Sequence, residues 1–85
     1  MRKDMRECVM RLRMAFVKEF KRGQNDSVSI RLITKTFLKV IIVSSTFSKK
    51  SIITRFHMAE SMAPDKIRRS DLSRVVSLQL FSPED

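Results

Sequence analysis

Apolar residues recur at spacings of three and four over residues 4–22, which is the period of one face of an α-helix. The members of this stripe are Met5, Cys8, Val9, Leu12, Phe16 and Phe20. Gly23, the only glycine of the chain, follows the stripe and is expected to end the helix in the left-handed conformation. The pattern therefore predicts a first helix over residues 4–22 with one buried side.

Three later segments alternate or run apolar in the manner of β-strands, over residues 28–33, 37–44 and 73–81. The positions expected to face the core are Val28, Ile30 and Leu32, then Leu38, Val40 and Ile42, then Val76, Leu78 and Leu80. The opposite sheet face would carry Ile33, Ile41, Val43, Val75 and Phe81. Such an apolar face indicates either a partner surface or packing against the chain termini.

A second helix is predicted over residues 49–63, with Ser48 or Ser51 as its N-cap. Ile52, Phe56, Ala59 and Ala63 would share its buried face, and Pro64 would end or kink it. The order helix, strand, strand, helix, strand predicts an α+β fold, in which a three-stranded sheet carries helices packed on one face. The 85 residues form a single domain, 1–85.

The titratable residues offer little for catalysis or for a metal site. The single cysteine, Cys8, excludes an intramolecular disulfide, and together with His57, the only histidine, it cannot supply the four ligands of a structural zinc site. Cys8 lies on the apolar stripe and is expected to be a small buried hydrophobe. No Gly-rich phosphate loop, paired carboxylates or nucleophile–base pair is visible, so we do not expect an enzyme.

No apolar run approaches the roughly 20 residues of a membrane helix, and the first residues interleave charge with apolar side chains, unlike a signal peptide. With one cysteine, this indicates a reducing intracellular compartment, the cytoplasm. A mitochondrial targeting segment in residues 1–22 is the alternative, which Asp4, Glu7 and Glu19 oppose.

The formal net charge is +9, and the segment between Asp26 and Glu60 contains no acidic residue. It contains six basic ones: Arg31, Lys35, Lys39, Lys49, Lys50 and Arg55. Such a field attracts an acidic protein or a nucleic acid, although a solvated surface gives the same pattern. The candidate contacts are Lys49, Lys50, Arg55, Arg68 and Arg69.

Two blocks of the sequence resemble the BolA family, whose fold is related to the class II KH fold. The first runs from Leu38 to Ser44 as a Val/Ile-rich strand, after which Phe47, Lys50 and Arg55 fall in register with the family's Phe, Lys and Arg. The second, Val75 to Glu84, is similar to its last strand and the Thr-Pro-Glu that opens its final helix. The resemblance covers about residues 28–84.

The resemblance implies an adaptor that pairs with a monothiol glutaredoxin and shares a [2Fe–2S] cluster, in iron–sulfur cluster handling or iron-dependent regulation. His57 would be the metal ligand and a further contact residue, although an exposed helix histidine is the simpler interpretation. The family's glycine is replaced by Lys49, its histidine position falls on Phe56, and the segment 34–36 holds no second ligand. Two alternatives stay open: a nucleic-acid-binding regulator that uses the basic second helix, and a divergent member without a cluster.

Overall fold

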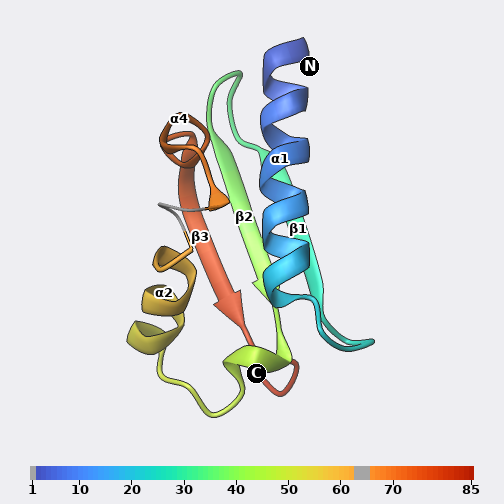
Figure 1. Ribbon diagram of the computed structural model, residues 1–85, viewed down its shortest axis with the longest axis vertical. Helices are drawn as coiled ribbons and strands as arrows, with labels where there is room; N and C mark the ends of the chain where they lie inside the picture. The colour runs from blue at the N-terminus through green and yellow to red at the C-terminus, as the bar shows by residue number, and fades with distance from the viewer. Residues whose placement is uncertain (1, 63–65) are drawn as a thin grey trace.

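A computed structural model describes residues 2–62 and 66–85 of the chain (Figure 1). The elements in chain order are α1 (Lys3–Phe20), β1 (Ser27–Leu32), β2 (Leu38–Val43), the 3-10 turn η1 (Ser45–Phe47), α2 (Ile52–Glu60), α4 (Arg69–Leu72) and β3 (Val75–Phe81). The α+β class with a three-stranded sheet, predicted from the hydrophobic pattern, is confirmed.

The sheet has the strand order β1-β2-β3 and is mixed. Strands β1 and β2 pair antiparallel across a short connection, whereas β2 and β3 pair parallel. A parallel pair needs a crossover connection, and the segment that contains α2 and α4 provides it. The two longer helices, α1 and α2, lie on the same side of the sheet in Figure 1, which gives a two-layer arrangement.

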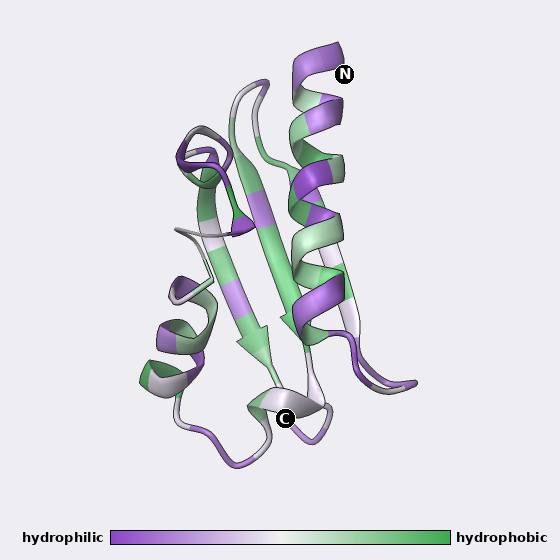
Figure 2. Ribbon diagram, viewed as in Figure 1, coloured by the Kyte–Doolittle hydropathy of each residue, from purple (hydrophilic) through white to green (hydrophobic). Residues whose placement is uncertain are grey.

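The core fills the space between the helices and the central strand. From α1 it takes the stripe Met5, Cys8, Leu12, Phe16 and Phe20, and from β2 it takes Leu38, Val40 and Ile42. Figure 2 shows the apolar colour concentrated on β2, the strand that has neighbours on both sides. The buried stripe of the first helix and the core face of the second strand therefore agree with the prediction.

The prediction that Val76 faces the core is wrong, because the pairing of β2 with β3 shifts by one residue. Leu38 lies opposite Val75, but the next residue, Lys39, lies opposite Ser77. The extra residue in β3 is a bulge, which reverses the alternation at that point. Val75 therefore packs against the core, while Val76 is 56% exposed.

Leu32 is also not a core residue, since it is 44% exposed at the end of the edge strand β1. The far sheet face carries Ile41 and Val43, both half-buried, and the exposed Phe81. The described helices α1 and α2 lie on the opposite side.

The end of α1 differs from the prediction at Gly23, which does not take the left-handed conformation. The helix ends at Phe20, and Lys21 is already extended. The buried carboxylate of Asp26 instead fixes the connection after the helix, because its Oδ2 accepts hydrogen bonds from the backbone N–H groups of Arg22 and Gly23, both at 2.9 Å. The same carboxylate accepts from the backbone and hydroxyl of Ser45, which joins the α1–β1 connection to η1.

The second helix begins later than residue 49, the predicted start. Ser51 is the N-cap of α2, and its hydroxyl accepts a hydrogen bond from the Thr54 N–H at 3.1 Å. The predicted end of the helix at Ala63 and Pro64 lies outside the described residues. The prediction that Ile52 is buried is wrong, since it is 68% exposed. The prediction that Ala59 is buried is confirmed, and Arg55 is buried as well.

Candidate protein-interaction surface

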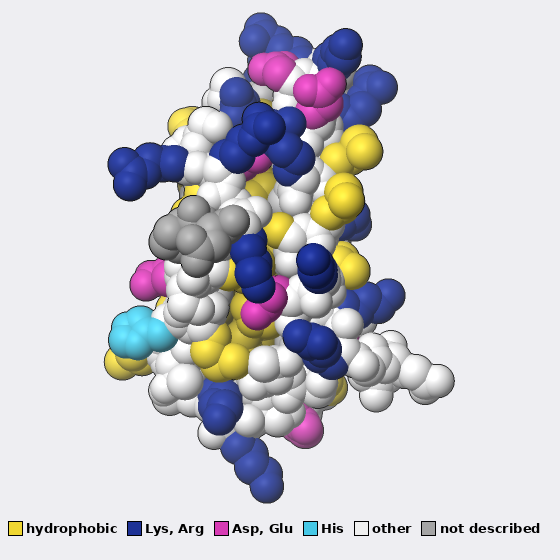
Figure 3. Space-filling view, viewed as in Figure 1, with side chains coloured by type: hydrophobic (Ala, Val, Ile, Leu, Met, Phe, Trp, Pro, Cys, Tyr) yellow, Lys and Arg dark blue, Asp and Glu magenta, His cyan; other side chains and the backbone are white. Residues whose placement is uncertain are grey.

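The start of α2 carries an exposed group of apolar and basic side chains, which we call the α2 ridge. Its members are Lys49, Lys50, Ile52, Ile53 and His57, all of them exposed. Ile52 and Ile53 are 68% and 69% exposed, more than any other large apolar residue described except Met14, which is equally exposed. Figure 3 shows the histidine of this ridge, in cyan, at the molecular surface. Large apolar side chains rimmed by polar ones are typical of interaction sites.

Arg55 fixes the base of the ridge to the end of the sheet. Its side chain is only 9% exposed, and its guanidinium donates to the carbonyls of Lys50 at 3.0 Å and of Leu80 at 3.1 Å. It also forms a bidentate ion pair with the Asp85 carboxylate. This Arg55 pairing, together with hydrogen bonds from the backbone and hydroxyl of Ser82, holds the pKa of Asp85 well below its usual range. The base of the ridge is therefore tied to the end of β3 and to the C-terminal residue by Arg55.

The sequence predicts Arg55 as a contact for a partner or nucleic acid, and the structure shows that its side chain is mostly buried. All its polar bonds described here run inward, to two backbone carbonyls and one carboxylate. These bonds use four of the five N–H donors of the guanidinium, which leaves one for an external phosphate. Arg55 is a structural residue that positions Lys50 and the first turn of α2.

Lys49 is held in the left-handed backbone conformation, with φ of 60°. It is the only non-glycine residue with positive φ in the described ranges 2–62 and 66–85. This conformation costs an L-residue roughly 1–2 kcal/mol and costs glycine almost nothing. The turn that leads into α2 therefore has the backbone shape that a glycine would satisfy best.

The ridge offers one metal-ligating side chain, the exposed imidazole of His57. The residues described contain no group of three or more His, Cys, Asp and Glu side chains that could hold a metal ion. Cys8 is buried, and burial, aided by Asp71, raises the pKa of its thiol to about 11. A thiol of this kind is a poor ligand. The described residues alone do not supply the four ligands that a [2Fe–2S] cluster needs, and His57 is the one imidazole among them.

The remaining predicted contacts lie elsewhere. Arg68 and Arg69 are exposed at the start of α4, near the beginning of β3, whereas the ridge lies near its end. Lys49, Lys50 and His57 thus belong to α2 and the turn that leads into it, whereas the two arginines belong to α4 and its N-cap. The hydrophobic pattern missed the exposure of Ile52 and Ile53; the signal was that two adjacent isoleucines cannot both face the core from one helix.

No protein-family model, curated protein or solved structure matches this chain. Among the described residues, no helix is both long and apolar enough to cross a membrane.

Proposed function

We propose that this protein is a BolA-like adaptor that pairs with a monothiol glutaredoxin in iron–sulfur cluster handling or iron-dependent regulation. The two sequence blocks that resemble the family carry the proposal, and the backbone at Lys49 supports it most directly. Lys49 stands where the family has glycine, and its φ of 60° is the conformation that glycine favours. A backbone conformation that favours glycine, at the position where the resemblance places one, supports the proposal.

The arrangement of elements supports the same proposal. The chain orders one helix, two antiparallel strands, a crossover with α2 and α4, and a third strand parallel to the second. This arrangement is compatible with the class II KH-like fold that the resemblance implies. Fold alone does not assign function, so the proposal depends on the α2 ridge as the surface that binds the glutaredoxin.

The ridge has the composition of a protein-binding surface. Ile52 and Ile53 supply apolar contact area, and Lys49 and Lys50 supply positive charge that steers an acidic partner. His57 stands four residues beyond Ile53, one helical turn away on the same side. In the proposed complex, His57 supplies the one ligand of this chain and the glutaredoxin side supplies the others.

Calorimetric titration with a monothiol glutaredoxin from the same cell tests the proposal. We expect a one-to-one complex, and we expect Ile53→Ser to weaken it by about tenfold or more, as for an apolar anchor. Met14→Ser is the matched control, because Met14 is equally exposed but lies on α1. Absence of binding by the unmodified chain would refute the adaptor function.

A loss of cluster chemistry is the second form of the same proposal. The scarcity of ligands in the described residues favours it. It predicts that the glutaredoxin binds while His57→Ala leaves the visible spectrum of the cluster complex unchanged.

Nucleic-acid binding is a separate candidate, favoured by the net charge of +9 and by the exposure of Lys49, Lys50, Arg68 and Arg69. Its signature is an affinity that falls steeply with salt concentration, because bound phosphates release counterions. Filter binding of single- and double-stranded DNA and RNA at several salt concentrations tests this candidate directly.

A further inference from the structure

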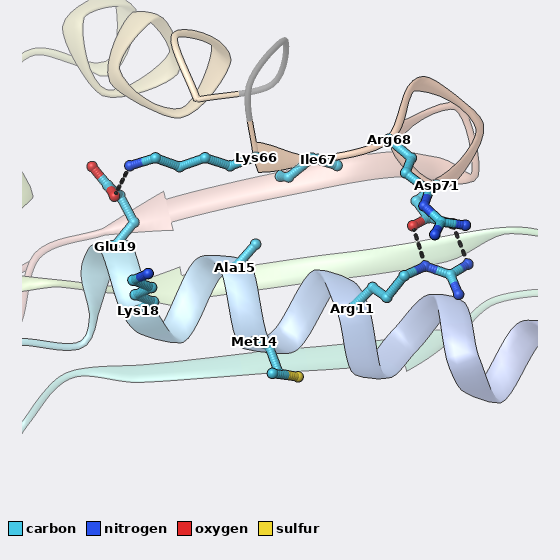
Figure 4. Close-up of a pocket in the computed structure, with 9 residues that line it drawn as sticks. All are labelled: Arg11, Met14, Ala15, Lys18, Glu19, Lys66, Ile67, Arg68 and Asp71. Carbon is cyan, nitrogen blue, oxygen red and sulfur yellow. Dashed lines mark hydrogen bonds and ion pairs between the residues drawn. The ribbon is translucent and has the colours of Figure 1, made fainter.

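A groove of about 440 Å³ lies between α1 and the segment that leads into α4 (Figure 4). Volumes of this size are typical of small-molecule sites. None of the five α2-ridge residues lines it. Its apolar part is formed by Met14, Ala15 and Ile67, and Figure 3 shows apolar surface in a hollow between basic side chains.

Ion pairs between the two walls bound this groove at both ends (Figure 4). At one end Arg11 donates to both oxygens of Asp71, at 2.7 and 2.8 Å. At the other end Lys66 pairs with Glu19 at 2.8 Å. A hollow closed at both ends suits a ligand of limited length, whereas an extended peptide would have to cross one of the ion pairs.

The lining of the groove carries an excess of positive charge. Its lining contains four cations, Arg11, Lys18, Lys66 and Arg68, and two carboxylates, Glu19 and Asp71. Both carboxylates are used by the two end pairs. Lys18 and Arg68 are exposed and form no ion pair within the described part of the chain. The excess positive charge stands beside apolar surface, so the complementary ligand carries both an apolar body and a negative group.

The two ends differ in how easily they open. The Asp71 side chain is 4% exposed and is held in a bidentate pair, which fixes that end. The side chains of Lys66 and Glu19 are 51% and 34% exposed, and exposed pairs of this kind contribute little to stability. Glu19 therefore marks the position that an external carboxylate can take, because its own carboxylate already makes the expected contact with Lys66.

We propose that this groove binds a small amphiphilic carboxylate, with its apolar body on Ala15 and Ile67 and its head group at Lys66 and Lys18 in place of Glu19. This site is separate from the α2 ridge, and the proposal does not depend on whether the protein binds a glutaredoxin.

Titration of the isotope-labelled chain with octanoate, followed by amide shifts in NMR spectra, tests this site. We expect shifts centred on Ala15, Lys18 and Ile67, and much weaker shifts with octanol, which lacks the charge, and with acetate, which lacks the apolar body. No shifts, equal shifts with octanol, or shifts centred on the far sheet face at Val43 and Phe81 would overturn the proposal.

Charge variants separate this site from general attraction to a basic protein. We expect Lys18→Glu with Arg68→Glu to weaken octanoate binding about tenfold. The control pair, Arg13→Glu with Arg69→Glu, makes the same change in net charge at exposed cations outside the groove. We expect its affinity for octanoate to stay within about twofold of that of the unmodified chain. An equal loss of octanoate affinity in the two double variants would contradict binding in the groove.

A gain of binding gives the sharpest test. Glu19→Gln removes the internal carboxylate that competes for Lys66, and we expect it to tighten octanoate binding about two- to fivefold, in line with the strength of an exposed ion pair. Glu7→Gln, at an exposed acid on the same helix outside the groove, is the control and should not change the affinity. Unchanged or weaker binding by Glu19→Gln would contradict the placement of the head group.

Discussion

Single residues carry much of the information that the hydrophobic pattern lacks. The left-handed backbone at Lys49 and the buried guanidinium of Arg55 do not follow from that pattern. A basic residue one turn into a helix usually faces water, so the hydrophobic pattern does not predict that Arg55 is buried. The carbonyl of Leu80 and the Asp85 carboxylate, both distant in sequence, decide its place.

Replacing Lys49 by glycine should stabilise the protein. The change relieves the cost of a left-handed L-residue, and the greater freedom of glycine in the unfolded chain offsets part of the gain. We expect the free energy of unfolding to rise by up to about 1 kcal/mol, as measured by urea denaturation. Lys50→Gly is the control and should destabilise, because Lys50 does not have positive φ. An equal decrease in the free energy of unfolding of Lys49→Gly and Lys50→Gly would contradict backbone strain at Lys49.

Replacing Asp26 by asparagine should destabilise the protein in a pH-dependent manner. Burial opposes ionisation of Asp26, but hydrogen bonds from Arg22, Gly23 and Ser45 outweigh it and lower its pKa below 3.8. An amide NH₂ in place of one oxygen would face N–H donors, at a cost of about 2–3 kcal/mol at neutral pH.

The sign of the pH effect follows from the lowered pKa. The stabilisation by ionised Asp26 is complete above the unfolded-state value near 3.8 and is lost as the pH falls towards the folded-state value. We expect the unmodified chain and Asp26→Asn to differ in their free energy of unfolding by a constant amount at neutral pH and by a smaller amount below about pH 4. Urea denaturation at several pH values measures this difference. A difference in the free energy of unfolding that grows in acid would contradict the lowered pKa of Asp26.

Cys8 should resist alkylation in the folded protein. Its thiol is 1% exposed and has a pKa of about 11, so on the order of one molecule in a thousand is thiolate at pH 8. We expect iodoacetamide to label Cys8 in urea but not in buffer, as followed by mass spectrometry. Rapid labelling of the folded chain would place Cys8 outside the core.

At the scale of elements, periodicity located the helices and strands but failed where one element meets another. The bulge opposite Leu38 and Lys39 exchanged the faces of Val75 and Val76, and an alternating pattern cannot reveal a pairing irregularity. The start of α2 shifted because Ser51 and not Ser48 caps it, and both serines satisfy the capping preference equally well.

The exposure of the α2 ridge predicts that its apolar residues serve binding and not stability. We expect Ile52→Ser with Ile53→Ser to change the free energy of unfolding by less than about 0.5 kcal/mol for each substitution. A core substitution such as Leu38→Ala, at a side chain with no exposure, should cost about 2–5 kcal/mol. Urea denaturation compares the two directly, and a large loss in the ridge variant would mean that the isoleucines are buried.

At the scale of the whole molecule, the fold class was predictable and most of the candidate site was not. Apolar spacing fixes which segments are helices and strands, so the α+β class followed from the sequence. Charge and the family resemblance predict Lys49, Lys50 and His57, but the anchoring by Asp85 and the groove beside α1 depend on contacts between distant segments. Local patterns carry no information on such contacts.

We propose that this chain forms a complex with a cluster-bearing glutaredoxin through the α2 ridge. A visible circular dichroism titration of the protein into a [2Fe–2S]-loaded monothiol glutaredoxin, made without oxygen, tests this complex. We expect a distinct spectrum that saturates at one-to-one and reverts with His57→Ala. A spectrum that stays that of the glutaredoxin alone at every ratio would contradict cluster sharing by this chain.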